Sequence, residues 1–255
     1  MRTTLTTIVL TALAASAQDS TPTFKVDVVS KTVSAVNYRA KGGSTKIDFE
    51  GTALMPSALG EAKVESRQAV TAIDAKFEGL GSPWQFGAEY LTYVLWAVSP
   101  EGKSSNLGEL ILDKNGRAQL KTTSELPVFG LVVTAEPYFA VSVPSELIVV
   151  QNELRKNTEG RRFVVEAKSE FYKRGEYAKL GNPLGMTPDL KSQPLELYEA
   201  RNAVSIATSF KADKYASDTL DRSKASLKMA ENALAMKKDR KDVITLARES
   251  VQFAE

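Results

Sequence analysis

Residues 90–98 read YLTYVLWAV, a run that is apolar on both faces of an extended chain. A strand that contacts water on one face alternates apolar and polar residues, because successive side chains point to opposite sides of the sheet. A run without a polar face has to be covered on both sides. We therefore predict that residues 90–98 form a central strand, with the rest of the fold built around it.

The segments on either side of this run have the two-residue period of half-buried strands. Examples are residues 24–28, 47–49, 73–77 and 110–112. Turn signals separate them, and residues 113–116 (DKNG) suit a hairpin because Asn-Gly tolerates the positive φ of a type I′ turn. Short strands at spacings of about 8–12 residues are typical of a sandwich. The pattern predicts an immunoglobulin-like antiparallel β-sandwich over residues 22–170.

From residue 195 the apolar period changes to that of helices. Three stripes at three- and four-residue spacing predict an antiparallel segment of two to three helices over residues 195–255. Residues 171–194, rich in Pro and Gly, predict a hinge or linker. The fold class is thus a segregated α+β. The last stripe reaches Glu255 without a stop signal, which fits either a final helix or a chain that continues into a further domain.

The N-terminus has the features of a secretory signal peptide at residues 1–17. Arg2 supplies the positive charge, residues 5–15 form a short apolar region, and residues 15–17 (ASA) match a cleavage site for small side chains. The apolar stretch is too short to span a bilayer. We expect export to the periplasm or outer membrane of a bacterium, with no transmembrane segment after signal cleavage.

The composition excludes several classes of site. The chain has no His and no Cys, so it has no imidazole base, thiolate nucleophile, disulfide or His- or Cys-bound metal. The net charge of +2 gives no reason to expect nucleic-acid binding, which needs a concentrated basic surface. We predict no cofactor, no metal and no catalytic residue.

Aromatic residues near the central run are candidates for ligand binding. Trp84 and Tyr90 could form a face that stacks on a glycan or a partner, whereas Trp96, in the middle of the run, fits the core better. Trp84 follows Gly-Ser-Pro in a segment typical of a turn. We therefore predict Trp84 and Tyr90 as a ligand face.

Pairs of carboxylates leave open the alternative that the protein is an enzyme. Glu61 with Glu65, or Glu136 near Tyr138, could serve a glycosidase, although pairs of this kind are expected by chance in a chain with 31 acidic residues. Residues 237–241 (KKDRK) are most simply an exposed turn between helices.

Three segments resemble known bacterial envelope proteins: residues 93–103 (YVLWAVSPEGK), 107–110 (LGEL) and 133–137 (VTAEP). They are similar to the extracytoplasmic β domain of anti-sigma-K factors. The order of a β domain followed by an Ala-rich helical segment resembles the N-terminal half of the outer-membrane protein A family. The peptidoglycan-binding domain of that family has no counterpart here, so the resemblance transfers no binding residue.

Together these features predict a non-enzymatic exported protein with a structural or adaptor role near peptidoglycan or the outer membrane. The expected partner is an envelope protein or peptidoglycan, and the oligomeric state is left open. One alternative is a glycan- or protein-binding module that uses the aromatic face, and a second is a carboxylate-based glycosidase.

Overall fold

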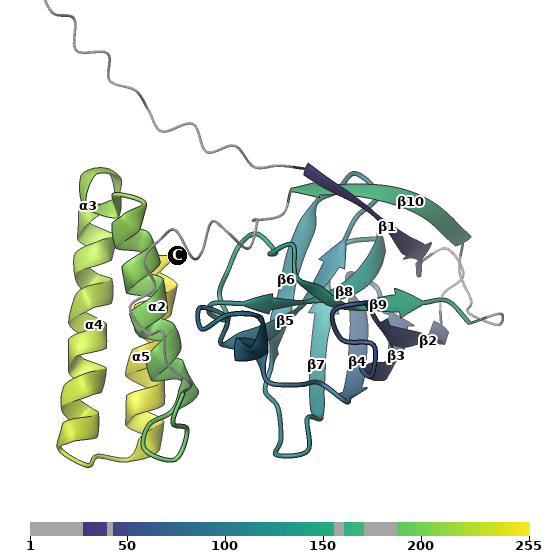
Figure 1. Ribbon diagram of the computed structural model, residues 1–255. Coiled ribbons are helices and arrows are strands. Elements are labelled where there is room, and N and C mark those ends of the chain that lie inside the picture. The colour runs from purple at the N-terminus through teal and green to yellow at the C-terminus, as the bar shows by residue number, and fades with distance from the viewer. Residues whose placement is uncertain (1–27, 40–42, 156–160, 171–187) are drawn as a thin grey trace, which may run out of the picture.

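The structure is a computed structural model that describes residues 28–39, 43–155, 161–170 and 188–255 (Figure 1). The predicted signal peptide, residues 1–17, lies outside the described residues, as do residues 171–187 of the predicted hinge. The chain forms a mixed α+β structure in which the strands precede the helices, as the sequence predicts.

Within the described residues, ten strands and one short 3₁₀ helix make up the first part of the chain. They are β1 (Val28–Asn37), β2 (Gly43–Gly51), β3 (Leu59–Ser66), β4 (Thr71–Glu78), η1 (Pro83–Phe86), β5 (Thr92–Val98), β6 (Ser104–Leu110), β7 (Ala118–Ser124), β8 (Val128–Glu136), β9 (Ile148–Glu153) and β10 (Arg161–Glu170).

The strands form one antiparallel sheet that is nearly barrel-shaped rather than clearly a sandwich. Its main path runs β6-β5-β8-β9-β2-β3-β4-β7, and the β1–β10 pair joins it at β8. The ends of this path approach each other, since the Thr122 hydroxyl on β7 donates to the Leu107 carbonyl on β6 at 2.8 Å. A β-sandwich, the architecture that the sequence predicts, consists of two separate sheets. Here β8 pairs with β5 along one edge and with β9 and β1 along the other, and so continues a single sheet.

The predicted central strand is β5. Every residue of β5 is buried, and Trp96 has no exposed surface, so it belongs to the core. Directly paired residues of adjacent strands share one face of the sheet. Val94 lies opposite both Glu109 of β6 and Thr134 of β8, and these residues therefore lie on the same face of the sheet.

The helices follow in the order α2 (Leu195–Ser209), α3 (Ala212–Tyr215), α4 (Ser217–Ala235) and α5 (Arg240–Ala254). Of the turn predicted at residues 237–241, residues 237–239 connect α4 to α5, whereas Arg240 and Lys241 already belong to α5. The Asp239 side chain caps α5 by accepting from the Lys241 amide at 2.9 Å. Small side chains let α4 and α5 approach closely. Ser223 and Ser250 are fully buried, and each hydroxyl donates to the other residue's carbonyl at 2.8 Å.

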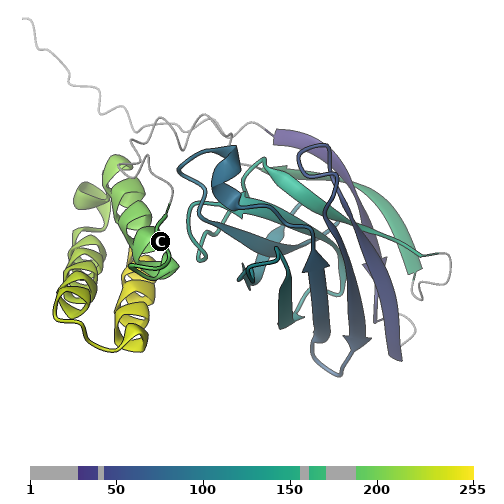
Figure 2. The ribbon, with the colours of Figure 1, turned by 60° about the horizontal axis from the view of Figure 1, so that its bottom comes forward.

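The helices lie beside the curled sheet in both views (Figures 1 and 2). Polar contacts join the helices to the sheet and its loops. The Asn202 amide on α2 donates to the Glu89 carbonyl at 3.0 Å, Arg248 on α5 reaches Glu109 on β6, and Glu255 accepts from Tyr138. Apolar side chains from both parts also belong to one continuous core.

Across the described part of the chain, no helix combines the length and the apolar character that crossing a membrane requires.

Candidate functional site

The junction between helices and sheet contains a cleft of about 680 Å³, which we call the Trp84 cleft. Its sheet side includes Trp84, Thr92 and Glu109, and its helix side includes Glu196 and Arg240. The cleft therefore exists only while the helices are docked. Its walls combine an aromatic ring, a hydroxyl and charges of both signs, which is the mixture found in sites that bind polar ligands.

Trp84 reaches this cleft because of the local sequence around it. The fixed φ of Pro83 suits the first position of a helix, and the buried side chains of Pro83 and Phe86 anchor η1 to the core. Trp84, between these anchors, is half-buried and lines the cleft. Tyr90 is fully buried and does not line it. The structure therefore places the two residues of the predicted ligand face in different environments.

Arg248 on α5 connects three elements at the cleft. Its guanidinium donates to Glu109 Oε2 at 3.0 Å, lies 3.7 Å from Glu196 Oε1, and sits 4.1 Å above the ring of Phe139. The other oxygen of Glu109 accepts from the Thr92 hydroxyl at 2.9 Å. The side chains of Glu109 and Glu196 are only 5% and 13% exposed, against 34% for Arg248. One cation thus serves two largely buried carboxyl groups.

Glu199 on α2 is a third carboxyl group at this point, and it is fully buried. Neither of its oxygens accepts from a donor group. Burial raises the pKa of Glu199 well above its ordinary value, and the nearby charges of Glu109 and Glu196 raise it further, while Arg248 lowers it. The Glu109 side chain lies within hydrogen-bonding reach of Glu199, a contact that two ionised carboxylates cannot make. Burial and the neighbouring carboxyl groups therefore favour the neutral form of Glu199.

Glu136, at the end of β8, is a second neutral acid. One of its oxygens accepts from the Thr134 hydroxyl and from the Ser145 amide, while the other has no partner. The Trp96 indole N–H donates to Thr134 at 2.8 Å and extends this buried network. Burial raises the pKa of Glu136 to about 8, against the lowering effect of these hydrogen bonds, and the charge of Glu255 raises it further.

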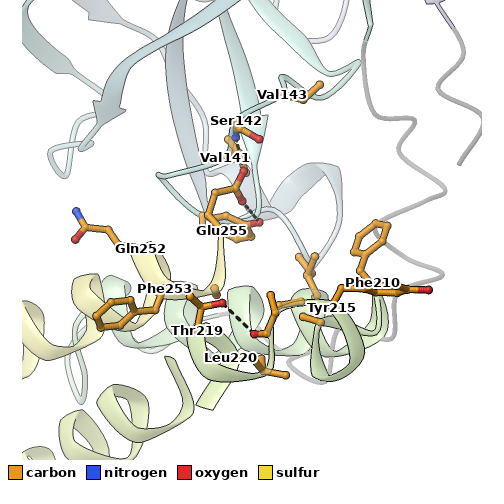
Figure 3. A pocket seen from close by; sticks show the side chains of 16 residues that line it. Val141, Ser142, Val143, Phe210, Tyr215, Thr219, Leu220, Gln252, Phe253 and Glu255 are labelled. Carbon is orange, nitrogen blue, oxygen red and sulfur yellow. Dashed lines mark hydrogen bonds between the residues drawn. The ribbon is translucent and has the colours of Figure 1, made fainter. Parts of the chain in front are cut away.

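A second hollow, of about 460 Å³, lies where the end of α5 meets the loop after β8. Figure 3 shows Glu255 directed toward Val141 and Ser142, with Phe253 and Tyr215 among the aromatic residues of the lining. The Glu255 carboxylate accepts from the Tyr138 hydroxyl at 2.7 Å and from the Ser142 amide at 2.8 Å. The hollow is mostly apolar, and these bonds already occupy its acidic group.

The carboxylate pairs that the sequence suggested lie elsewhere or serve other roles. Glu61 and Glu65 lie on the exposed face of β3, where Glu61 is 3.7 Å from the Lys46 amine and Glu65 is 3.7 Å from the Lys63 amine. Both are ordinary surface ion pairs. Glu136 faces a buried network, and the hydroxyl of the nearby Tyr138 bonds Glu255 instead.

Sequence reasoning missed Glu109, Glu196 and Glu199. A weak signal was present on α2, where Glu199 and Asn202 are three residues apart and interrupt an otherwise apolar surface that includes Ala203 and Ile206. A polar residue on the buried face of a helix marks a position that needs a specific partner. The partner, Glu109, is distant in sequence and could not be identified from the helix alone.

Among the side chains that the structure describes, no three Asp, Glu, His or Cys residues are grouped so as to hold a metal ion. No protein-family model matches the chain, and neither does any curated protein.

Proposed function

We propose that the chain is an exported, non-enzymatic protein of the bacterial cell envelope. It would act as a structural protein or adaptor near peptidoglycan or the outer membrane and bind its ligand in the Trp84 cleft. The signal-like residues 1–17 support export. The same proposal includes two finer expectations: that the chain is related to anti-sigma-K factors and the outer-membrane protein A family, and that its β domain is immunoglobulin-like.

The single observation that carries the binding role is the position of Trp84. A half-buried indole in the wall of a cleft offers an apolar surface on which a sugar ring or a peptide side chain can stack. The charged groups beside it, Glu196 and Arg240, can form hydrogen bonds with polar substituents of such a ligand. This arrangement favours the binding alternative more than a purely structural role.

The test is co-sedimentation of the chain, without residues 1–17, with purified peptidoglycan sacculi at low and high salt. We expect binding that survives high salt, since stacking is not screened by ions. Trp84→Ala should lower the bound fraction roughly tenfold, because loss of a buried aromatic contact costs about 1–2 kcal/mol.

Tyr215→Ala is the matched control, because Tyr215 is an exposed aromatic residue outside the Trp84 cleft. Equal binding by wild type and Trp84→Ala would contradict the proposed site. Release of soluble sugar from the sacculi would instead support the glycosidase alternative, with Glu109 and Glu196 as the carboxyl groups to substitute.

A further inference from the structure

The contact surface between helices and sheet contains many more acidic groups than basic ones. Glu109 and Glu136 come from the sheet, Glu196 and Glu199 come from α2, and Arg248 on α5 is a cation that pairs with Glu109 and Glu196. We call these four residues the interface carboxyls. Full ionisation would place four negative charges against one guanidinium in a region of low dielectric, where unpaired charge is costly.

Among the residues that the structure describes, Arg248 is the cation that acts on Glu199. Its charged neighbours are Glu109 from β6, Glu196 from its own helix and Arg248 from α5. Arg248 already donates to Glu109 at 3.0 Å and lies near Glu196. An ionised Glu199 would therefore add a negative charge between two carboxylates that already share one cation.

An ionised Glu136 would likewise lie near another negative charge. The charged group that acts on it is Glu255, at the end of α5, and this charge is also negative. Thr134 and Ser145 provide hydrogen bonds to one oxygen, but the other oxygen is buried without a partner. Loss of the Glu136 proton would create repulsion between the sheet and the last residue of the helical segment.

We propose that the protons on Glu136 and Glu199 hold the helices on the sheet, and that ionisation of these two groups releases residues 195–254 as an intact helical unit. Each carboxyl group gives its proton to solvent, and the resulting carboxylates become hydrated as the contact opens. The helices remain together because the Ser223–Ser250 pair joins α4 to α5 and the Arg201–Glu231 ion pair joins α2 to α4, and none of these residues is an interface carboxyl.

Release of the helices would also open the Trp84 cleft and the hollow beside Glu255, because helices form one wall of each and the strands or their loops form the other. The pKa values set the direction of the effect. Burial holds the pKa of both groups above the ordinary value, to about 8 for Glu136, so the docked state binds more protons than the open state at neutral pH. Docking is therefore strongest in mild acid and weakens as the pH rises.

The distance between the two parts can be measured directly, because the chain has no cysteine of its own. Spin labels on Thr123→Cys in β7 and Lys224→Cys in α4 occupy exposed positions on the sheet and on the helices. We expect a narrow, short distance distribution at about pH 5 and a broad shift to longer distances at about pH 9.

Neutral variants separate this mechanism from general alkaline instability. The double variant Glu136→Gln, Glu199→Gln keeps the shape of both side chains without an ionisable proton and should hold the short distance at both pH values. Glu61→Gln, on the exposed face, is the matched control and should open as wild type does.

An unchanged distance in wild type at high pH would overturn the proposal, as would opening of the double variant. If the double variant fails to fold, small-angle scattering of the unlabelled wild-type chain decides the question. An increase in radius of gyration with unchanged helical circular dichroism supports release, whereas loss of the helical signal means global unfolding and contradicts it.

Discussion

The exposed face and the helix-covered face of the same sheet differ in how their acidic side chains are paired with basic ones. On the exposed face of β2, β3, β4 and β7, acidic side chains lie beside basic ones in partly exposed ion pairs, as with Glu61 and Lys46 or Asp74 and Lys121. On the helix-covered face of β5, β6 and β8, Glu109 and Glu196 share Arg248, and Glu136 has no cation.

The difference shows that burial, rather than residue type, decides the chemical state of a glutamate. Water screens the exposed ion pairs, so they contribute little to stability. The buried groups cannot all ionise without a large cost, and Glu136 and Glu199 remain protonated instead. The covered surface is therefore expected to make the structure less stable as the pH rises, whereas Asp48 on the exposed face, whose pKa is lowered by its hydrogen bond with Arg155, acts only in acid.

Among single substitutions at one pH, the largest expected effect on stability comes from removing Arg248. Arg248→Ala leaves Glu109 buried without its cation, and we expect the free energy of unfolding to fall by about 2–4 kcal/mol, given the partial exposure of the guanidinium. Urea denaturation followed by circular dichroism measures this change.

Arg67→Ala is the matched control on the exposed face, where Arg67 lies 3.7 Å from Glu65. It should change the free energy of unfolding by no more than about 0.5 kcal/mol. Similar losses in the two variants would show that the covered and exposed charges do not differ as described.

The next effect is the pH dependence of stability. Because the folded pKa of Glu136 is raised from 4.5 to about 8, its contribution is complete below about pH 4.5 and is lost as the pH rises toward 8. The slope should approach about 1.4 kcal/mol per pH unit for each such group. Urea denaturation at a series of pH values should show Glu136→Gln with a shallower slope than wild type.

Glu61→Gln provides the comparison for this series and should keep the wild-type slope. A free energy of unfolding that rises between about pH 5 and pH 8 would reverse the expected sign and contradict a protonated Glu136 in the folded state.

A smaller effect should follow loss of a single hydrogen bond. Thr92→Val removes the hydroxyl that donates to Glu109 at 2.9 Å in a buried setting and should cost about 1–2 kcal/mol. Gln119→Ala removes an exposed bond to Asp74 of similar length, 2.8 Å, and should cost about 0.5 kcal/mol or less. Comparison of the unfolding temperatures of the two variants tests whether burial of the hydrogen bond accounts for the larger loss of stability in Thr92→Val.

The sequence predicted local structure well and long-range pairing less well. The two-residue period identified β4 and the apolar run identified β5, because these signals arise from neighbours along the chain. The approach of β6 to β7 and the use of both edges of β8 depend on contacts between distant segments. That is why a sandwich was expected and a nearly barrel-shaped sheet was found.

The candidate site was predictable only in part. Trp84 stood out because a Trp after Gly-Ser-Pro suggests a turn near the surface, and the structure places it in a cleft wall. Tyr90 begins the apolar run at residues 90–98, which predicts a covered strand, and the structure buries it rather than placing it on a ligand face. Glu199 resembles any helical glutamate in sequence, and its unusual state depends on Glu109 and Arg248, which lie far away along the chain.

The most direct test of a protonated, buried interface is NMR titration of ¹³C-labelled glutamate carboxyl groups, with Glu136→Gln and Glu199→Gln used for assignment. Our account predicts that Glu136 titrates near pH 8 and that Glu199 is also still protonated at neutral pH. Titration of both Glu136 and Glu199 below about pH 5, in a chain that remains folded, would contradict it.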